Sequence, residues 1–91
     1  MLNRNIRTLR LRRGLNQTEL ASALGVSKQT VSNWENDNIL PSVDMLLRLS
    51  EFFSVSTDFL LGLDHKKYIQ VDHLSDEKLN HLQQIINDLL K

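Results

Sequence analysis

The sequence is poor in several residue types, and each shortage excludes a class of protein. It contains no cysteine, one proline and three glycines. The absence of cysteine excludes disulfide scaffolds, cysteine zinc sites and thiol nucleophiles, and it is typical of a reducing compartment. No apolar run approaches the roughly 20 residues of a membrane span, and the basic N-terminal segment is not followed by the apolar region of a secretion signal. We therefore expect a cytoplasmic protein that has no membrane partner.

A net charge is also missing, because 11 lysine and arginine residues balance 11 aspartate and glutamate residues. The balance hides an asymmetry. Residues 1–40 carry six basic and three acidic side chains, whereas residues 41–91 carry five basic and eight acidic ones. A basic front half with an acidic rear half predicts that one surface meets a polyanion. The hydrophobic content of 41% over 91 residues suffices for one domain with a modest core.

The apolar spacing along the chain is helical almost throughout. Gly14 and Gly25 are typical of helix ends, and Asn16 with Glu19 three residues later resembles a capping box. Ser27 can cap the helix that follows. We therefore expect an all-α fold with a compact five-helix domain over residues 1–63, whose helices run at about 3–13, 16–25, 27–35, 42–53 and 56–62.

Residues 17–36 form the most informative segment. Two helices of about eight residues are predicted here, joined by a tight turn at Gly25. Ala21 is small enough to let the second helix approach closely, and Val31 and Trp34 are apolar contacts that fix the angle between the helices. This pattern is typical of the helix-turn-helix, whose second helix can lie in the major groove of DNA.

The second of these helices has two different sides. At about 100° per residue, Val31 and Trp34 share one side. The opposite side carries amides, a hydroxyl and an ammonium group, on Gln29, Asn33, Ser32 and Lys28, and Thr30 lies beside them. Such groups read base edges, because Gln and Asn can bond adenine, Lys can donate to guanine, and Thr can touch a thymine methyl group. The alternative for Lys28, Gln29, Ser32 and Asn33 is an ordinary solvated helix face, which would be the better interpretation outside this motif.

The order of these residues resembles a known family. The matching run is Arg7-Thr8-Leu9-Arg10, Gly14-Leu15-Asn16-Gln17, Leu20-Ala21, Leu24-Gly25-Val26-Ser27, Thr30-Val31-Ser32, Trp34-Glu35, Pro41, Leu46, Leu49, Phe53 and Val55. On these residues the chain resembles the lambda-repressor-like helix-turn-helix family, the Xre/Cro-type regulators of bacteria and phages. The resemblance covers residues 3–62 and implies a five-helix domain that binds DNA.

The resemblance also implies roles for individual residues. Base-reading positions fall on Lys28, Gln29 and Asn33, with Thr30 and Ser32 beside them. Phosphate-contacting positions, where helix N-termini favour anions, fall on Asn16, Gln17, Ser27, Asn36 and Asn38. Arg10 and Glu35 match a structural pair that ties the first helix to the end of the third.

The last part of the chain has a different character. Residues 64–74 are predicted as a polar linker with a candidate short strand at 68–71, and residues 75–91 as a C-terminal helix. The apolar seam of this helix consists of Leu79, Leu82, Ile86 and Leu89, widened by Ile85 and Leu90. Because an isolated helix of about sixteen residues is marginal, the seam must be buried on the chain's own domain or against a second chain. We favour a homodimer, because a palindromic operator rewards two-fold symmetry.

These observations lead to one expected function and two alternatives. We expect a sequence-specific regulator, more a repressor than an activator, that binds double-stranded DNA as a homodimer and reads a palindromic operator with residues 28–35. One alternative is an antitoxin-like repressor whose C-terminal segment binds a toxin partner. The other is a protein-interaction module on the same fold without DNA binding. We expect no catalysis, cofactor or metal, because there is no nucleophile elbow or Gly-rich phosphate loop and no ligand-like spacing of His65, His73 and His81.

Overall fold

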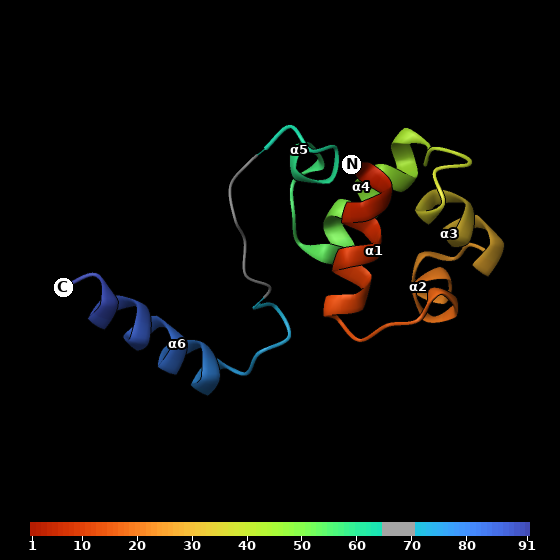
Figure 1. Ribbon diagram of the computed structural model, residues 1–91. Helices are drawn as coiled ribbons and strands as arrows, with labels where there is room; N and C mark the ends of the chain where they lie inside the picture. The colour runs from red at the N-terminus through yellow and green to blue at the C-terminus, as the bar shows by residue number, and fades with distance from the viewer. Residues whose placement is uncertain (65–70) are drawn as a thin grey trace.

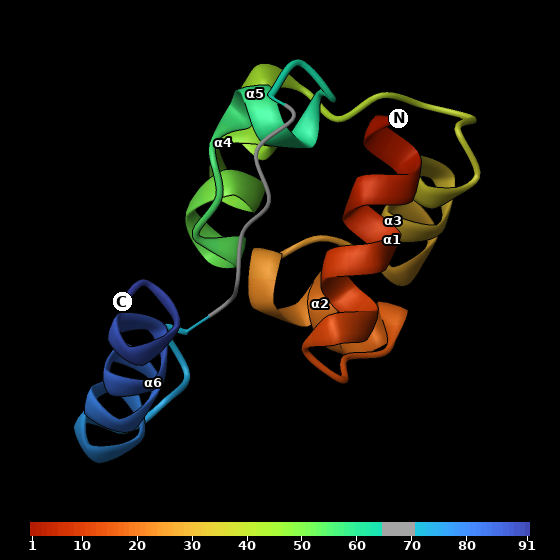
Figure 2. The same cartoon turned by 60° about the vertical axis from the view of Figure 1, so that its left-hand side comes forward.

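The computed structural model describes residues 1–64 and 71–91, and every element in these ranges is a helix. The elements are α1 (Leu2–Arg12), α2 (Gln17–Leu24), α3 (Lys28–Glu35), α4 (Val43–Phe53), α5 (Thr57–Leu60) and α6 (Asp76–Leu89). Helices α1 to α5 gather in one body, and α6 extends away from it (Figures 1 and 2). The expected all-α fold is confirmed over these residues. The candidate strand at 68–71 falls mainly outside the described residues.

Side-chain caps determine where most of these helices begin. At α2, the Asn16 side chain accepts a hydrogen bond from the Glu19 amide at 2.7 Å, and the Glu19 carboxylate accepts one from the Asn16 amide at 3.0 Å. This is a complete capping box. The other four capped helices each begin after a serine whose hydroxyl accepts from the third helical amide, at Ser27, Ser42, Ser56 and Ser75. The predicted starts of these helices are therefore confirmed.

The turn between α2 and α3 depends on Gly25. This residue has φ of 72°, in the left-handed region that a side chain disfavours. The Val26 amide then donates to the Ala21 carbonyl at 2.9 Å, and the Gly25 amide donates to the Ser22 carbonyl at 3.2 Å. These two bonds form a Schellman motif, which reverses the chain within a few residues and sends it into α3.

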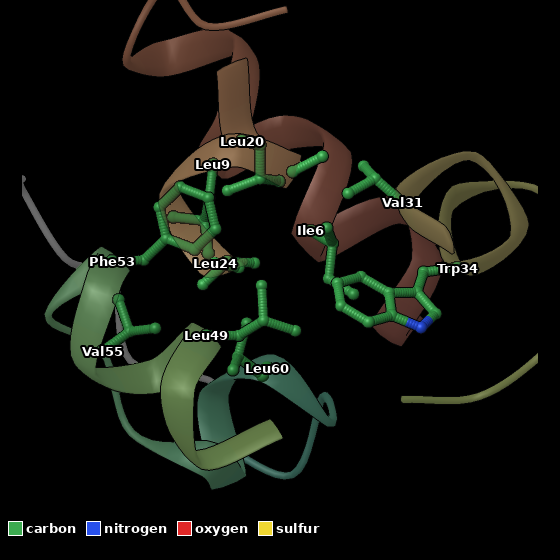
Figure 3. Packing of buried hydrophobic residues seen from close by; sticks show 11 residues of the cluster. Ile6, Leu9, Leu20, Leu24, Val31, Trp34, Leu49, Phe53, Val55 and Leu60 are labelled. Carbon is green, nitrogen blue, oxygen red and sulfur yellow. The ribbon is translucent and has the colours of Figure 1, made fainter. Parts of the chain in front are cut away.

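The core collects side chains from all five helices of the body and from the loop between α4 and α5 (Figure 3). Its 11 buried hydrophobic residues are Ile6, Leu9, Leu20, Ala21, Leu24, Val31, Trp34, Leu49, Phe53, Val55 and Leu60. Burying each large side chain contributes about 1.5–3 kcal/mol. Because α1 and α2 both pack against α3, this core holds α3 in a defined orientation.

Helix α6 contrasts with the body, because none of its residues is buried. Leu79, Leu82 and Ile86 are half-buried, while Leu89 is 78% exposed and Leu90 is 80% exposed. The helix lies on the side of the body away from α3 in both views (Figures 1 and 2). The apolar seam is therefore not docked on the chain's own domain in this arrangement.

Candidate nucleic-acid interface

Helix α3 is anchored through one side. Val31 is fully buried and Trp34 is 4% exposed. Both side chains point into the same cluster as Ile6 of α1 (Figure 3). Because a large aromatic and a branched side chain are both enclosed, rotation of α3 about its axis would empty two core positions. The opposite side of α3 is therefore held outward.

The outward side carries the five residues that the sequence singled out for base reading. Lys28 and Gln29 are exposed, and Thr30, Ser32 and Asn33 are partly exposed. The Gln29 amide nitrogen donates to the Asn33 side-chain oxygen at 3.0 Å. This bond aligns the two amides one turn apart and leaves the Gln29 oxygen free to accept and the Asn33 nitrogen free to donate. A donor and an acceptor side by side match the edge of a base.

Two further hydrogen bonds order the hydroxyls of α3. The hydroxyls of Ser27 and Thr30 lie 2.8 Å apart, and the Thr30 amide donates to the Ser27 hydroxyl at 3.1 Å. The Asn36 side chain donates to the Ser32 hydroxyl at 3.2 Å. A hydroxyl has one donor and two acceptor sites, so these bonds orient the hydroxyls of Ser27, Thr30 and Ser32 without using all of their hydrogen-bonding capacity. The start of α3 thus offers amide groups, oriented hydroxyls and the methyl group of Thr30.

The residues assigned to phosphate contact lie around the ends of α2 and α3. Asn16, Ser27, Asn36 and Asn38 are exposed. Gln17 is half-buried, and its amide nitrogen donates to the Glu35 carboxylate at 3.3 Å. Gln17 therefore connects the first residue of α2 to the last residue of α3.

The same carboxylate takes part in a buried ion pair. Arg10 contacts Glu35 through two nitrogens, at 2.7 and 2.9 Å, and donates to the Leu15 carbonyl at 2.8 Å. The Arg10 and Glu35 side chains are 9% and 3% exposed. The hydrogen bond to Glu35 raises the pKa of Arg10 above its ordinary value, although desolvation opposes the shift. The pair fixes the end of α3 to α1 and to the α1–α2 turn.

Three further contacts, which the sequence did not predict, connect the helices of the body to one another or to the segment before α6. Asn5 donates from one amide group to the carbonyls of Phe59 and Leu60, at 3.1 and 2.9 Å, and so fastens α1 to α5. Arg48 of α4 donates to the Leu24 carbonyl at 3.2 Å, at the end of α2. The third contact is an ion pair at 2.6 Å between Arg13 and Asp72. These partners are far apart in the sequence, so no local pattern identifies them.

Within residues 1–64 and 71–91, no group of three or more histidine, aspartate or glutamate side chains is arranged to hold a metal ion. In the same ranges, no helix has the length and apolar character needed to cross a membrane.

Comparison with known proteins gives consistent matches. A family model described as Helix-turn-helix matches residues 6–60. The HTH-type transcriptional regulator ImmR of Bacillus subtilis (strain 168) is 33% identical over 87 residues, which cover 96% of this chain and 68% of ImmR. Repressor protein CI of Enterobacteria phage phi80 is 42% identical over 61 residues, which cover 67% of this chain and 25% of CI. The chain thus spans two thirds of the first relative and a quarter of the second.

A solved structure also matches this chain. The P22 c2 repressor, in complex with a synthetic operator, has a TM-score of 0.66 and 33% sequence identity, covering 70% of this chain and 97% of that chain.

Proposed function

The chain belongs to the Helix-turn-helix family, and from this premise we propose that it is a transcriptional regulator that binds double-stranded DNA in a sequence-specific manner, as a repressor. One observation carries the proposal: α3 has an enclosed apolar side at Val31 and Trp34 and, opposite, an outward row of hydrogen-bonding groups. An outward row of this kind suits the major groove. The chain would act in the cytoplasm without catalysis, cofactor or metal.

The base-reading residues in this proposal are those of the outward side of α3. The paired amides of Gln29 and Asn33 present a donor and an acceptor to an adenine edge, and Lys28 donates to guanine. The Thr30 methyl group contacts a thymine methyl group, and Ser32 lies beside these residues. Sequence specificity then resides in a single helix, whose position is set by the core and by the pair of Arg10 and Glu35.

Phosphate contacts position this helix on the duplex without reading sequence. We assign them to polar groups at the starts of α2 and α3, where helix N-termini also favour anions, and in the loop after α3. The residues are Asn16, Gln17, Ser27, Asn36 and Asn38. Gln17 has a second role here, because its bond to Glu35 couples a phosphate-side residue to α3.

Dimerisation through α6 is the remaining part of the proposal. The seam of Leu79, Leu82, Ile85, Ile86, Leu89 and Leu90 is uncovered in the single chain. A second copy would bury the seam, and two linked domains bind a two-fold site more tightly than one. The half-sites of such an operator would lie about one helical turn of DNA, or a multiple of it, apart.

The test is the double substitution Gln29→Ala with Asn33→Ala. A bound sequence is first selected from a random duplex pool with the wild-type chain, and binding of each variant to it is then measured. Each lost bidentate contact should cost about 1–3 kcal/mol of specific binding. The same double substitution should leave the weak binding to unrelated duplexes nearly unchanged.

Helix α6 provides a matched control. Gln83 donates to Asn87 at 3.0 Å, with the same four-residue spacing as the pair on α3. Gln83→Ala with Asn87→Ala removes the same groups from a helix that is not assigned to the groove, and it should bind the selected sequence like wild type. Equal binding by both double variants would show that α3 is not the reader.

A further inference from the structure

Among the described residues before α6, Asp72 contacts the five-helix body. Arg13 Nη2 and Asp72 Oδ2 lie 2.6 Å apart, and the Ser54 hydroxyl donates to the same Asp72 oxygen at 3.3 Å. The Arg13 side chain is 17% exposed, and that of Asp72 is 39% exposed. One carboxylate oxygen of Asp72 therefore contacts donors at the ends of two helices of the body, Arg13 after α1 and Ser54 after α4.

The body orients the two residues that contact Asp72. The Arg13 guanidinium carbon lies 5.0 Å from the centroid of the Phe52 ring and 5.5 Å from that of Phe53. The two rings pack edge to face, and Phe53 is fully buried. Ser54 follows them with φ of 54°, a left-handed conformation that ends α4 and places its hydroxyl beside Arg13. The guanidinium thus lies against one ring of the core, Phe53, and one ring packed on the core, Phe52.

The distance from this contact to α6 is short. Asp72 stands four positions before Asp76, the first residue of α6. Between them the Leu74 amide donates to the Val71 carbonyl at 3.0 Å, and Ser75 caps the helix. Four residue steps span at most about 14 Å even when fully extended, and this turn shortens the path. Fixing Asp72 therefore restricts where α6 can begin.

We propose that Arg13, Ser54 and Asp72, which we name the Arg13 latch, determine the spacing of half-sites that the dimer accepts. This inference rests on the proposed function, with α3 as the reader and α6 as the dimer contact. Two readers joined by free tethers would tolerate many half-site separations. With the latch closed, α6 leaves the body from a fixed point on the side away from α3 (Figures 1 and 2). The two copies of α3 in the dimer are then held at one preferred distance from each other, and this distance selects one spacing of half-sites along the duplex.

The first experiment measures the latch without DNA. Because the chain has no cysteine, Ser22→Cys on α2 and Asn80→Cys on α6 allow two spin labels to be attached, and mixing with excess unlabelled chain isolates distances within one chain. Electron–electron double resonance should give a narrow distance distribution for the wild-type background and a broad one after Asp72→Ala. Glu77→Ala is the control, since Glu77 is an exposed carboxylate in the first turn of α6. A distribution that stays narrow in Asp72→Ala would overturn the latch.

The second experiment measures binding to a series of duplexes whose half-sites are separated by successive single base pairs. Wild type and Glu77→Ala should prefer one spacing, and Asp72→Ala should lower that preference about three- to tenfold, because a hydrogen-bonded ion pair that is partly exposed is only partly shielded from water. Binding of Asp72→Ala to a single half-site should equal that of wild type. A wild-type chain that binds no duplex would refute the proposed function and the spacing inference together. Normal binding with an unchanged spacing profile in Asp72→Ala would refute the spacing inference alone.

Discussion

Helices α3 and α6 carry the same kind of amide pair, but only α3 is packed in the core. Each carries a glutamine that donates to an asparagine four residues later, at 3.0 Å in both cases. Each also begins at a serine cap. The side of α3 opposite its amides is enclosed by the core, whereas no residue of α6 is buried. An amide pair can therefore be held in a fixed orientation, as the proposed base reading by α3 requires, only where the rest of its helix is packed in a core.

The largest expected effect is on the free energy of unfolding, to which a side chain of α3 should contribute far more than one of α6. Trp34→Ala removes a buried aromatic from α3 and should lower the free energy of unfolding by about 3–5 kcal/mol. Leu82→Ala in α6 should change it by no more than about 0.5 kcal/mol, as is usual for surface positions. Urea unfolding followed by circular dichroism, at chain concentrations low enough for monomers, measures both. Similar losses in the two variants would mean that α6 packs on the body.

The second effect concerns the pair that fixes the end of α3. Glu35→Leu leaves the buried Arg10 charge unpaired and should cost about 3 kcal/mol, the lower end for a broken buried pair because the Leu15 carbonyl still accepts from Arg10. Replacing both partners, as Arg10→Met with Glu35→Leu, should recover most of that loss. If the double variant were as unstable as Glu35→Leu, the loss could not come from the unpaired charge of Arg10.

The same pair predicts how Arg10 responds to pH. The pKa of Arg10 is raised in the folded chain, so the stability from its charged form is fully present below its ordinary value and is lost only as the pH rises through the raised one. Titration of Arg10 should therefore add no pH dependence to unfolding near neutrality.

A smaller effect tests what covers α6. Leu82→Asp with Ile86→Asp should give a folded monomer in analytical ultracentrifugation, with operator affinity reduced about 100-fold by the loss of linked binding. Asn80→Asp with Gln84→Asp adds the same charge to exposed polar positions of α6. That control should remain dimeric. A Leu82 and Ile86 double variant that still forms dimers would end the assignment of the seam.

Much of the fold could be predicted because its signals are local. The capping box at Asn16, the serine caps and the left-handed Gly25 depend on residues within one turn of each other. The buried side of α3 also follows from the spacing of Val31 and Trp34, since helical geometry alone puts them on one side. The prediction that Arg10 and Glu35 form a pair came from the family resemblance, and it carried no information on how deeply the pair is buried.

The contacts that lock these parts together were not predictable in the same way. Asn5 and Leu60 are 55 residues apart, and Arg13 and Asp72 are 59 residues apart. Ser54 adopts a left-handed conformation at a position where the sequence shows an ordinary polar residue. Each of these depends on how whole helices have already packed.

The sequence alone therefore determined the helices, their caps and the side each would bury, because hydrogen bonding and amphipathic periodicity act over a few residues. Tertiary structure decided which of those sides found a partner within the chain. The core enclosed one side of α3 and turned its amides outward, while no residue of α6 became buried and an ion pair at Asp72, shortly before α6, connects that part of the chain to the body. The physical reason is that burial depends on how surfaces distant in sequence are arranged. A local apolar pattern shows which side of a helix would gain from burial, but it does not determine which surface covers that side.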